Sequence, residues 1–348
     1  MANLAQGGAG MQALWHHHPS EYWGRRMNTY GFLDHDGKFG AIWYESGDDI
    51  SVYLPHKSNG IFTTNLDHWH RYSDYVGTAS DLADYSPEIN AAALVASQNN
   101  VYIKKSTIQP LTLEPGKYHP RVWRGIPSRN AFDSGYNGMA ISEDDHRVYI
   151  ESSHAAASLF EELSSLFRVI EPNPTNDCCF GHKVRELIIL ACTEVETCWR
   201  GVMSGNRSTP KRSYSTKDYV KLLPLLRLDE WSVKLKNYPS YPVIYPFKGW
   251  SAEEGETTKS LGWYDSYNAV KHDREGEFEK ATLHTLISAL GAVHIMLVAQ
   301  WGPELFHRFL GNRFSVFETV SIPKYDPESQ YICVPAGVFP IVAAPFFG

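Results

Sequence analysis

Side chains that could carry out acid–base chemistry are concentrated in the segment 263–274, whose sequence is WYDSYNAVKHDR. If this segment is helical, Tyr264, Asn268 and His272 lie on one face at four-residue steps, while its apolar side chains form another face that can be buried. An imidazole titrates near neutral pH, and a neighbouring amide can hold it in one orientation. Lys271 and Arg274 can stabilise negative charge on a phosphate. Together these residues suit phosphodiester cleavage without a metal ion, with His272 as the proton carrier.

A structural role for the same histidine is the alternative. A histidine near the end of a helix commonly interacts with the last carbonyl groups or with a neighbouring carboxylate, here Asp273. The sequence leaves both interpretations of His272 open.

A second concentration of charge lies between residues 200 and 221, where six basic residues face one acid, Asp218, for a local charge of about +5. The chain as a whole carries a formal charge of −7 and has a pI near 6.1, so a polyanion must bind to a local patch. A solvated loop without such a function is the alternative. The residues that we expect to contact RNA are Lys271, Arg207, Lys211, Arg212 and Lys217.

Helices must position both groups, because apolar residues recur at three- and four-residue steps from about residue 151 onwards. The expected helices cover residues 152–170, 183–204, a short stretch from 215 or 216, 261–273 and 277–301. Those over 183–204 and 277–301 have the widest apolar stripes, and we expect them at the centre of a bundle. The stretch 281–300 is long enough to cross a bilayer, but its polar groups, including His284 and His294, favour a buried core helix and no membrane contact.

The first part of the chain has the pattern of strands and turns. The expected strands are 38–44, 49–54, 101–104, 110–113 and 147–150, with a helix near 81–97. Two C-terminal stretches, 314–322 and 331–335, also have strand character, and we expect them to return to the N-terminal sheet. The sequence therefore predicts an α+β fold with a strand-rich domain at 1–150, a helical bundle at 151–302 and a C-terminal strand extension at 303–348.

Cysteine and histidine usage gives no sign of a metal site. The five cysteines are Cys178, Cys179, Cys192, Cys198 and Cys333. Their odd number fits reduced thiols in a cytosol, and the adjacent pair lacks the spacing of zinc ligands, so we expect small buried apolar residues. The histidine clusters 16–18 and 68–70 have no third and fourth ligand at fixed spacing, which favours surface histidines. We expect neither a metal nor a cofactor.

Residues 1–10 lack a basic start followed by an apolar core, which argues against a secretory signal and predicts a cytoplasmic protein. No glycine-rich phosphate loop follows a strand and opens a helix, and no Gly-x-Ser-x-Gly elbow occurs. P-loop nucleotide hydrolysis and serine-hydrolase chemistry are therefore disfavoured.

Residues 152–302, less than half of the chain, resemble HEPN (higher eukaryotes and prokaryotes nucleotide-binding) domains. Tyr267-Asn268-Ala269-Val270-Lys271-His272 matches the Asn-x-x-x-His portion of the nuclease motif Arg-polar-x-x-x-His, and the helix 185–199 with Glu194 and Glu196 is similar to that of bacterial members. Tyr267 stands where active members carry Arg, and a phenol lacks the fixed positive charge of a guanidinium. Arg274 or Arg185 could supply that charge in space.

The resemblance implies an all-helical bundle that forms a homodimer with its polar motifs near the dimer axis. It implies a metal-independent ribonuclease of prokaryotic antiviral defence or toxin type, with His272, Asn268 and Arg274 in the catalytic site. The alternative is a non-catalytic HEPN-like module that binds RNA, a nucleotide or a protein partner. Tyr267 favours the alternative, whereas Asn268, His272 and the basic segment favour cleavage.

Overall fold

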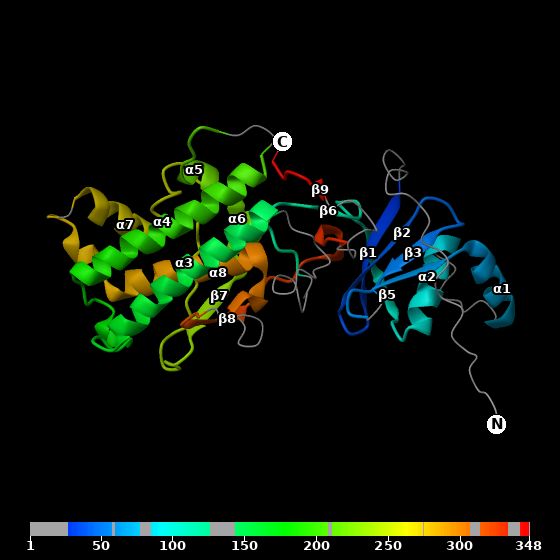
Figure 1. Cartoon of the computed structure of the whole chain (residues 1–348), viewed down its shortest axis with the longest axis horizontal. Coiled ribbons are helices and arrows are strands. Elements are labelled where there is room, and N and C mark those ends of the chain that lie inside the picture. The colour runs from blue at the N-terminus through cyan, green and yellow to red at the C-terminus, as the bar shows by residue number, and fades with distance from the viewer. Residues whose placement is uncertain are drawn as a thin grey trace, which may run out of the picture.

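The computed structural model describes residues 27–57, 60–76, 85–125, 143–207, 211–273, 275–306, 314–332 and 342–347 of the 348-residue chain. Its elements form two lobes, one built around a sheet and one built from helices (Figure 1). The predicted α+β class, with strands first and helices after them, is confirmed.

The first lobe contains a five-stranded antiparallel sheet of order β4-β3-β2-β1-β5. Its strands are β1 (Asn28–Asp34), β2 (Phe39–Tyr44), β3 (Ile50–Tyr53), β4 (Ile61–Thr64) and β5 (Ile103–Pro110), and its helices are α1 (Leu66–Val76) and α2 (Pro87–Gln98). Helix α2 begins where Ser86 accepts a hydrogen bond from the backbone N–H of Ile89 and Pro87 follows, a favourable start for a helix.

Both faces of the central strand β2 are covered, which explains why all its residues are buried. Ile42 and Tyr44 share a core with α2, whereas Phe39 and Trp43 pack with Ile332 from the C-terminal part of the chain. Alternate side chains of a strand point to opposite faces, so the C-terminal segment covers the face that α2 leaves open.

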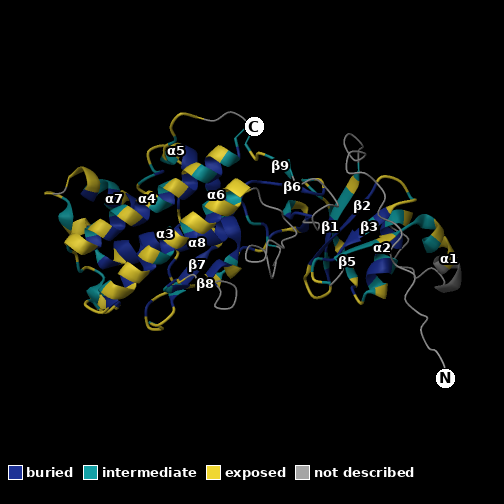
Figure 2. Cartoon of the chain, in the orientation of Figure 1, coloured by how far each residue is buried: buried dark blue, intermediate teal, exposed yellow. Residues whose placement is uncertain are grey.

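The second lobe is a helical bundle with a small two-stranded antiparallel sheet. Its long helices are α3 (Glu143–Phe167), α4 (His182–Gly205), α7 (Gly262–His272) and α8 (Leu283–Trp301), its short ones are α5 (Thr216–Tyr219) and α6 (Leu222–Leu226), and its strands are β7 (Ser232–Leu235) and β8 (Phe317–Ser321). Every residue of α8 except His284 is buried, and Figure 2 shows this central position. The prediction that the helices over 183–204 and 277–301 form the centre is confirmed.

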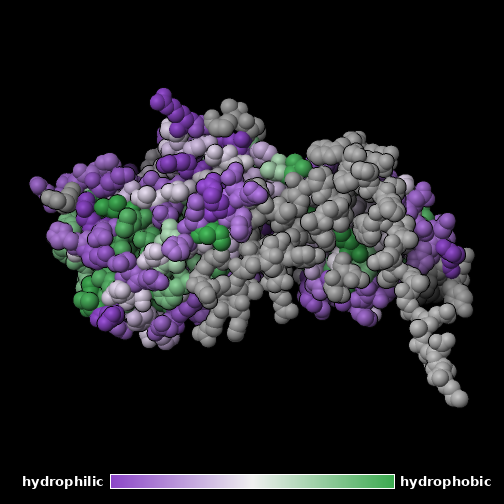
Figure 3. Space-filling view, in the orientation of Figure 1, coloured by the Kyte–Doolittle hydropathy of each residue, from purple (hydrophilic) through white to green (hydrophobic). Residues whose placement is uncertain are grey.

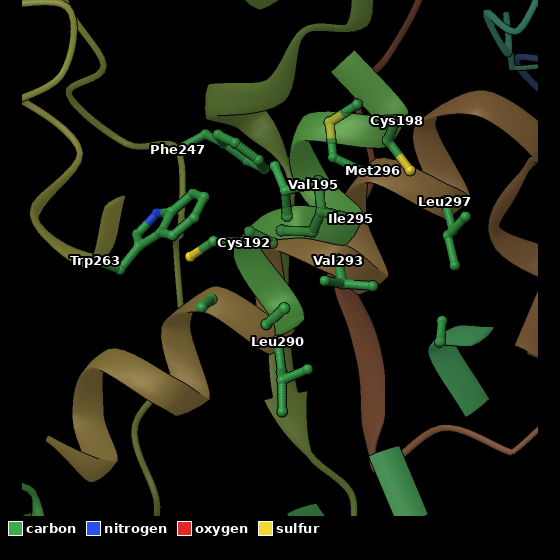
Figure 4. Close-up of a cluster of buried hydrophobic side chains, with 14 of the residues drawn as sticks. Cys192, Val195, Cys198, Phe247, Trp263, Leu290, Val293, Ile295, Met296 and Leu297 are labelled. Atoms are coloured by element: carbon green, nitrogen blue, oxygen red, sulfur yellow. The ribbon is translucent and has the colours of Figure 1, made fainter. Parts of the chain in front are cut away.

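The α4–α8 contact is the core of this lobe. Cys192, Val195 and Cys198 of α4 gather with apolar residues of α8 such as Leu290 and Val293 (Figure 4). Within the described residues, α8 is the helix long and apolar enough to cross a membrane, and 94% of its most apolar stretch is buried inside the protein. The predicted buried core helix is confirmed.

Three predicted strands are corrected. Residues 147–150 belong to α3, because acidic side chains at its start, Glu143 to Asp145, interact well with the helix N-terminus and Tyr149 begins the buried stripe. Tertiary packing therefore overrides the strand propensity of Val148 to Ile150. The stretches 101–104 and 110–113 are replaced by the single strand β5, and β1, β4 and α1 had no counterpart in the prediction.

The C-terminal strands pair differently from the expectation. Strand β8 pairs antiparallel with β7 of the helical lobe, and β9 (Val342–Ala343) pairs parallel with β6 (Lys117–Tyr118). Neither belongs to the five-stranded sheet, whose described edge strands are β4 and β5. The chain does return to the sheet, but through Ile332, which packs on its face rather than its edge.

The cysteine prediction is partly wrong. Cys192 and Cys198 are buried, as expected, but Cys178 is exposed and Cys179 half-buried. These two precede α4 in a loop whose backbone bonds to the start of α8, with Cys179 O accepting from Leu283 N at 2.8 Å. Cys333 and His16–His18 lie outside the described residues.

Candidate functional site

Helix α7 presents the two predicted faces, but Tyr264, which was predicted on the polar face, is buried. Trp263, Tyr267 and Val270 are buried, and the Trp263 indole N–H donates to Pro246 O at 2.8 Å. The opposite side carries Asn268, which is half-buried, and His272, which is exposed at the last position of the helix. The polar face is therefore on the surface and available to a ligand.

Asn268 and His272 make separate contacts. The Asn268 amide donates to the carbonyl oxygen of Tyr264 at 3.1 Å, one turn back in the same helix. Among the described residues, no hydrogen bond joins this amide to the imidazole of His272. The expected orientation of His272 by Asn268 is thus not formed within this chain.

Tyr267 positions the neighbouring cation. Its phenol oxygen accepts a hydrogen bond from Lys271 Nζ at 2.8 Å, and Nζ lies 4.9 Å from the ring centroid. This hydrogen bond raises the pKa of Lys271, and burial raises the pKa of Tyr267. Tyr267 therefore carries no charge itself but holds a charged group at its hydroxyl.

A second cation reaches the same end of α7 from α4. Arg185 donates from Nε and Nη2 to the carbonyl oxygen of Val270, at 3.2 and 3.0 Å. Carbonyl groups in the last turn of a helix lack partners within the helix, and a cation satisfies them well. Arg185 is half-buried and so occupies a fixed place beside the end of α7. Arg274, the third candidate cation, lies outside the described residues.

Glu196 of α4 forms the next contact along the α4–α7 interface. The Tyr264 hydroxyl donates to Glu196 Oε1 at 2.8 Å. Burial, with this hydrogen bond second, holds the pKa of Tyr264 far above its ordinary value. The tyrosine is therefore a neutral donor, and Glu196 and Arg185 fix α7 against α4 from two positions.

Carboxylates around the end of α7 are partly engaged. Asp273 accepts from the backbone N–H of Gly276 at 2.8 Å, and Glu277 forms an ion pair with Lys280 at 2.6 Å. His284, exposed at the start of α8, lies 3.5 Å from Asp177. Arg185 and Lys271 therefore act within a mixed field and not within a wide basic patch.

The basic segment folds around its one acid. Asp218 accepts from Lys211 Nζ at 2.6 Å and from the backbone N–H of Ser215 at 3.2 Å, and it lies 3.9 Å from Arg207. Burial opposes ionisation of Asp218, but the bonds from Lys211 and Ser215 prevail and lower its pKa. Ser215 and Asp218 form the capping box of α5, confirming the helix start predicted at Ser215 or Thr216.

The other expected RNA-binding side chains differ in exposure. Arg212 is exposed, Lys217 is exposed and lies 3.7 Å from Glu254, and the Arg207 side chain is only 15% exposed. Hydrophilic side chains gather over α5 in Figure 3. Arg212 and Lys217 are thus accessible in this conformation, whereas Arg207 is covered.

The basic segment and His272 lie near opposite ends of α4. Arg185 contacts the end of α7, whereas Trp199 contacts Tyr219 of α5, with ring centroids 5.2 Å apart. From residue 185 to residue 199 an α-helix rises about 21 Å. One extended strand of several nucleotides would have to follow α4 to touch both groups.

A groove with a volume of about 320 Å³ lies between α3 and α4. Leu159, Leu187 and Leu190 contribute apolar surface, and Glu194 at its side has a pKa raised by burial. At helical spacing Leu187, Leu190 and Glu194 face away from Arg185 and Glu196 on α4. The groove is therefore separate from the surface around His272.

Three of these contacts were not predicted from the sequence. Tyr267 and Lys271 are four residues apart, so helical spacing alone could have suggested their contact. The partners of Arg185 and Glu196 are distant in the sequence, and a sequence pattern gives no signal for them.

His68, which was expected at the surface, is half-buried, and its Nδ1 lies 3.0 Å from Thr64 Oγ1.

Comparison of the chain with protein-family models, with curated proteins and with solved structures finds no match.

Proposed function

We propose that this protein is a HEPN-like, metal-independent endoribonuclease that acts on single-stranded RNA at the end of α7. The observation that carries the proposal is that fixed hydrogen bonds place two cations, Arg185 and Lys271, at the end of α7, the helix whose last residue is the exposed His272. Positioned cations stabilise the charge that develops on a phosphate during cleavage. Arg185 thereby takes the role of the arginine that Tyr267 replaces.

The reaction is a transfer within the RNA chain. The 2′-hydroxyl attacks the adjacent phosphorus, a 2′,3′-cyclic phosphate forms, and the bond to the 5′-oxygen breaks. Neutral His272 accepts the proton of the 2′-hydroxyl, and a protonated imidazole delivers a proton to the departing 5′-oxygen. Arg185 and Lys271 hold the non-bridging oxygens.

A homodimer would supply both protonation states at once. One chain offers a single His272, whereas the reaction uses a base and an acid. A two-fold axis close to the end of α7 would bring a second His272 to the same phosphate. The Asn268 amide, which bonds to Tyr264 in one chain, would then be free to exchange partners at the interface.

The alternative function is a non-catalytic module that binds RNA, a nucleotide or a protein partner through the same surface. Two observations favour it: Tyr267 supplies no charge, and no hydrogen bond joins Asn268 to His272 within the described residues. A cytoplasmic location and a role in prokaryotic antiviral defence, or as a toxin, are parts of the nuclease proposal. They would be abandoned together with it.

The deciding experiment is incubation of purified protein with single-stranded RNA in a chelator, with the products analysed for cyclic phosphate ends. His272→Ala should reduce cleavage by about a hundredfold or more while RNA binding is retained, because a proton-transfer group is lost. His284→Ala is the matched control, since His284 is also exposed and sits on α8 beside Asp177. Binding without cleavage by the unmodified protein would select the module; full cleavage by His272→Ala would remove the nuclease site.

A further inference from the structure

The segment Val342–Phe347, here named the C-terminal strap, connects the two lobes along the surface. At one end it pairs with β6: Val342 N donates to Gly116 O at 3.0 Å and Ala344 N donates to Tyr118 O at 2.8 Å. The imidazole Nδ1 of His119, which follows β6, lies 2.7 Å from Ala344 O. The strap is therefore attached where the chain leaves the first lobe.

At its other end the strap lies on the C-terminus of α4. Phe347 N donates to Asn206 O at 2.7 Å, and Phe347 forms a parallel bridge with Arg207. The Phe347 ring lies 5.8 Å from the Arg207 guanidinium carbon, and the Tyr214 ring lies 5.9 Å from it. Arg207, a residue of the basic segment 200–221, is thus close to two aromatic rings.

Arg207 is incompletely satisfied in this environment. Its side chain is 15% exposed, its Asp218 contact is 3.9 Å long, and its buried Nε has no hydrogen-bond partner among the described residues. A buried guanidinium N–H without a partner costs free energy that an incoming anion would recover. Lys211 also bonds to Asp218, so the negative charge of this carboxylate is already largely compensated and is less available to Arg207.

The strap has the properties of a segment that detaches easily. Its strand has two residues, and Ala343, Pro345 and Phe346 are exposed, with Phe346 at 45%. Segments with few buried apolar contacts and exposed backbone hydrogen bonds open at low free-energy cost. Phe347 itself is half-buried and packs against the bundle core, so its release would expose one ring from the edge of that core and uncover Arg207.

We propose that the strap is an autoinhibitory cover over a phosphate site formed by Arg207 and Tyr214. When Phe347 leaves, Arg207 can bind a phosphate of single-stranded RNA, and the Tyr214 ring can stack on the adjacent base. The proposal rests on the RNA-directed function stated above and adds a regulation to it. It also explains why one of the expected RNA-binding residues is covered in this conformation.

The test compares the full chain with Phe347→Ala and with a chain lacking residues 342–348. The probe is a fluorescein-labelled, unstructured oligoribonucleotide, and its affinity is measured over a range of salt concentrations. We expect the affinity to rise about threefold to tenfold in both variants, and the magnitude of the salt slope to rise by about 0.7, the value for one phosphate on a single strand. Adding Arg207→Ala should cancel both increases.

Phe314→Ala is the control, because Phe314 is a phenylalanine outside the strap that is 40% exposed and makes no described contact with Arg207. Phe347→Ala retains β9, so it remains informative if the shortened chain folds poorly. Unchanged or weaker binding by folded Phe347→Ala, or an increase that survives Arg207→Ala, would overturn the strap proposal while RNA binding by the full chain kept the proposed function alive. Absence of RNA binding by the full chain and by every variant would remove both.

Discussion

Arg185 of α4 donates two hydrogen bonds, 3.2 and 3.0 Å long, to the main-chain oxygen of Val270, two residues before His272. The contact joins helices that are far apart in the sequence and closes the end of α7 with a guanidinium. It gives the candidate site a fixed cation and ties the position of His272 to the packing of α4.

Two substitutions at Arg185 should distinguish the contribution of its charge from that of its forked hydrogen-bonding geometry. Arg185→Ala should lower the cleavage rate by about a hundredfold, in the range seen when one stabilising donor is removed from a charged transition state. Arg185→Lys should restore part of that rate, because it retains the charge but loses the forked geometry. Single-turnover cleavage is the measurement, with thermal unfolding to check the fold.

The control for Arg185 is Lys183→Ala on the same helix. Lys183 forms ion pairs with Glu162 and Glu186 on the surface, at 2.9 and 3.1 Å, and such pairs contribute little to stability. The cleavage rate of Lys183→Ala should stay within about twofold of the rate of the unmodified protein. Equal losses in Lys183→Ala and Arg185→Ala would mean that general electrostatics, not the Val270 contact, sets the rate.

Tyr267 and Lys271 should behave as a coupled pair. Tyr267→Phe removes the hydroxyl that accepts from Lys271 Nζ, so the pKa of Lys271 should fall back toward its ordinary value. Cleavage should drop several-fold, Lys271→Met should have a larger effect, and the double variant should be no worse than Lys271→Met. Independent, multiplicative losses in this cycle would show that Tyr267 does not act through Lys271.

The basic segment should affect binding more than chemistry. Lys211→Ala with Arg212→Ala should weaken RNA binding, and the salt slope should become shallower by up to about 1.4, the value for two phosphate contacts on a single strand. The rate at saturating RNA should stay nearly unchanged, because the segment lies about 21 Å along α4 from the end of α7. Lys38→Ala, an exposed cation of the first lobe, is the control. A lower saturating rate with unaltered affinity would contradict this division of roles.

His294 should make the protein sensitive to mild acid. It is 1% exposed, with Nδ1 2.9 Å from Ser315 Oγ and Nε2 3.0 Å from Thr319 Oγ1. Burial, with a smaller contribution from Lys236, lowers its pKa from 6.5 to about 3. Between these values the unfolded chain binds the proton and the folded chain does not, so stability is present above pH 6.5 and falls with decreasing pH by about 1.4 kcal/mol per unit.

The measurement is chemical unfolding at pH 7.0 and pH 5.5. His294→Leu should be less stable at pH 7.0, because the buried Ser315 hydroxyl and the half-buried Thr319 hydroxyl lose their contacts with the imidazole, but its stability should vary less between the two pH values. An equally steep loss in both proteins would assign the acid sensitivity to other groups.

Local pattern alone determined much of the architecture. The apolar stripes of α4 and α8 are strong enough to predict both helices and their central position, because burial of such a stripe requires helical partners. The two faces of α7 follow from the same periodicity, and Ser215 marks the start of α5 because its side chain suits an N-cap. These features depend on residues three or four positions apart, which a single sequence displays.

Tertiary structure decided what the sequence could not. The strand propensity of residues 147–150 was overridden by packing in α3, and β8 and β9 found partners in β7 and β6. The hydrogen bonds of Arg185 to Val270 and of Tyr264 to Glu196 join residues 85 and 68 positions apart. Such contacts form only when packing of the apolar stripes brings two helices together, and no local preference encodes them. The candidate chemical groups of α7 can therefore be identified from its own sequence, whereas the cation beside it, Arg185, is contributed by α4.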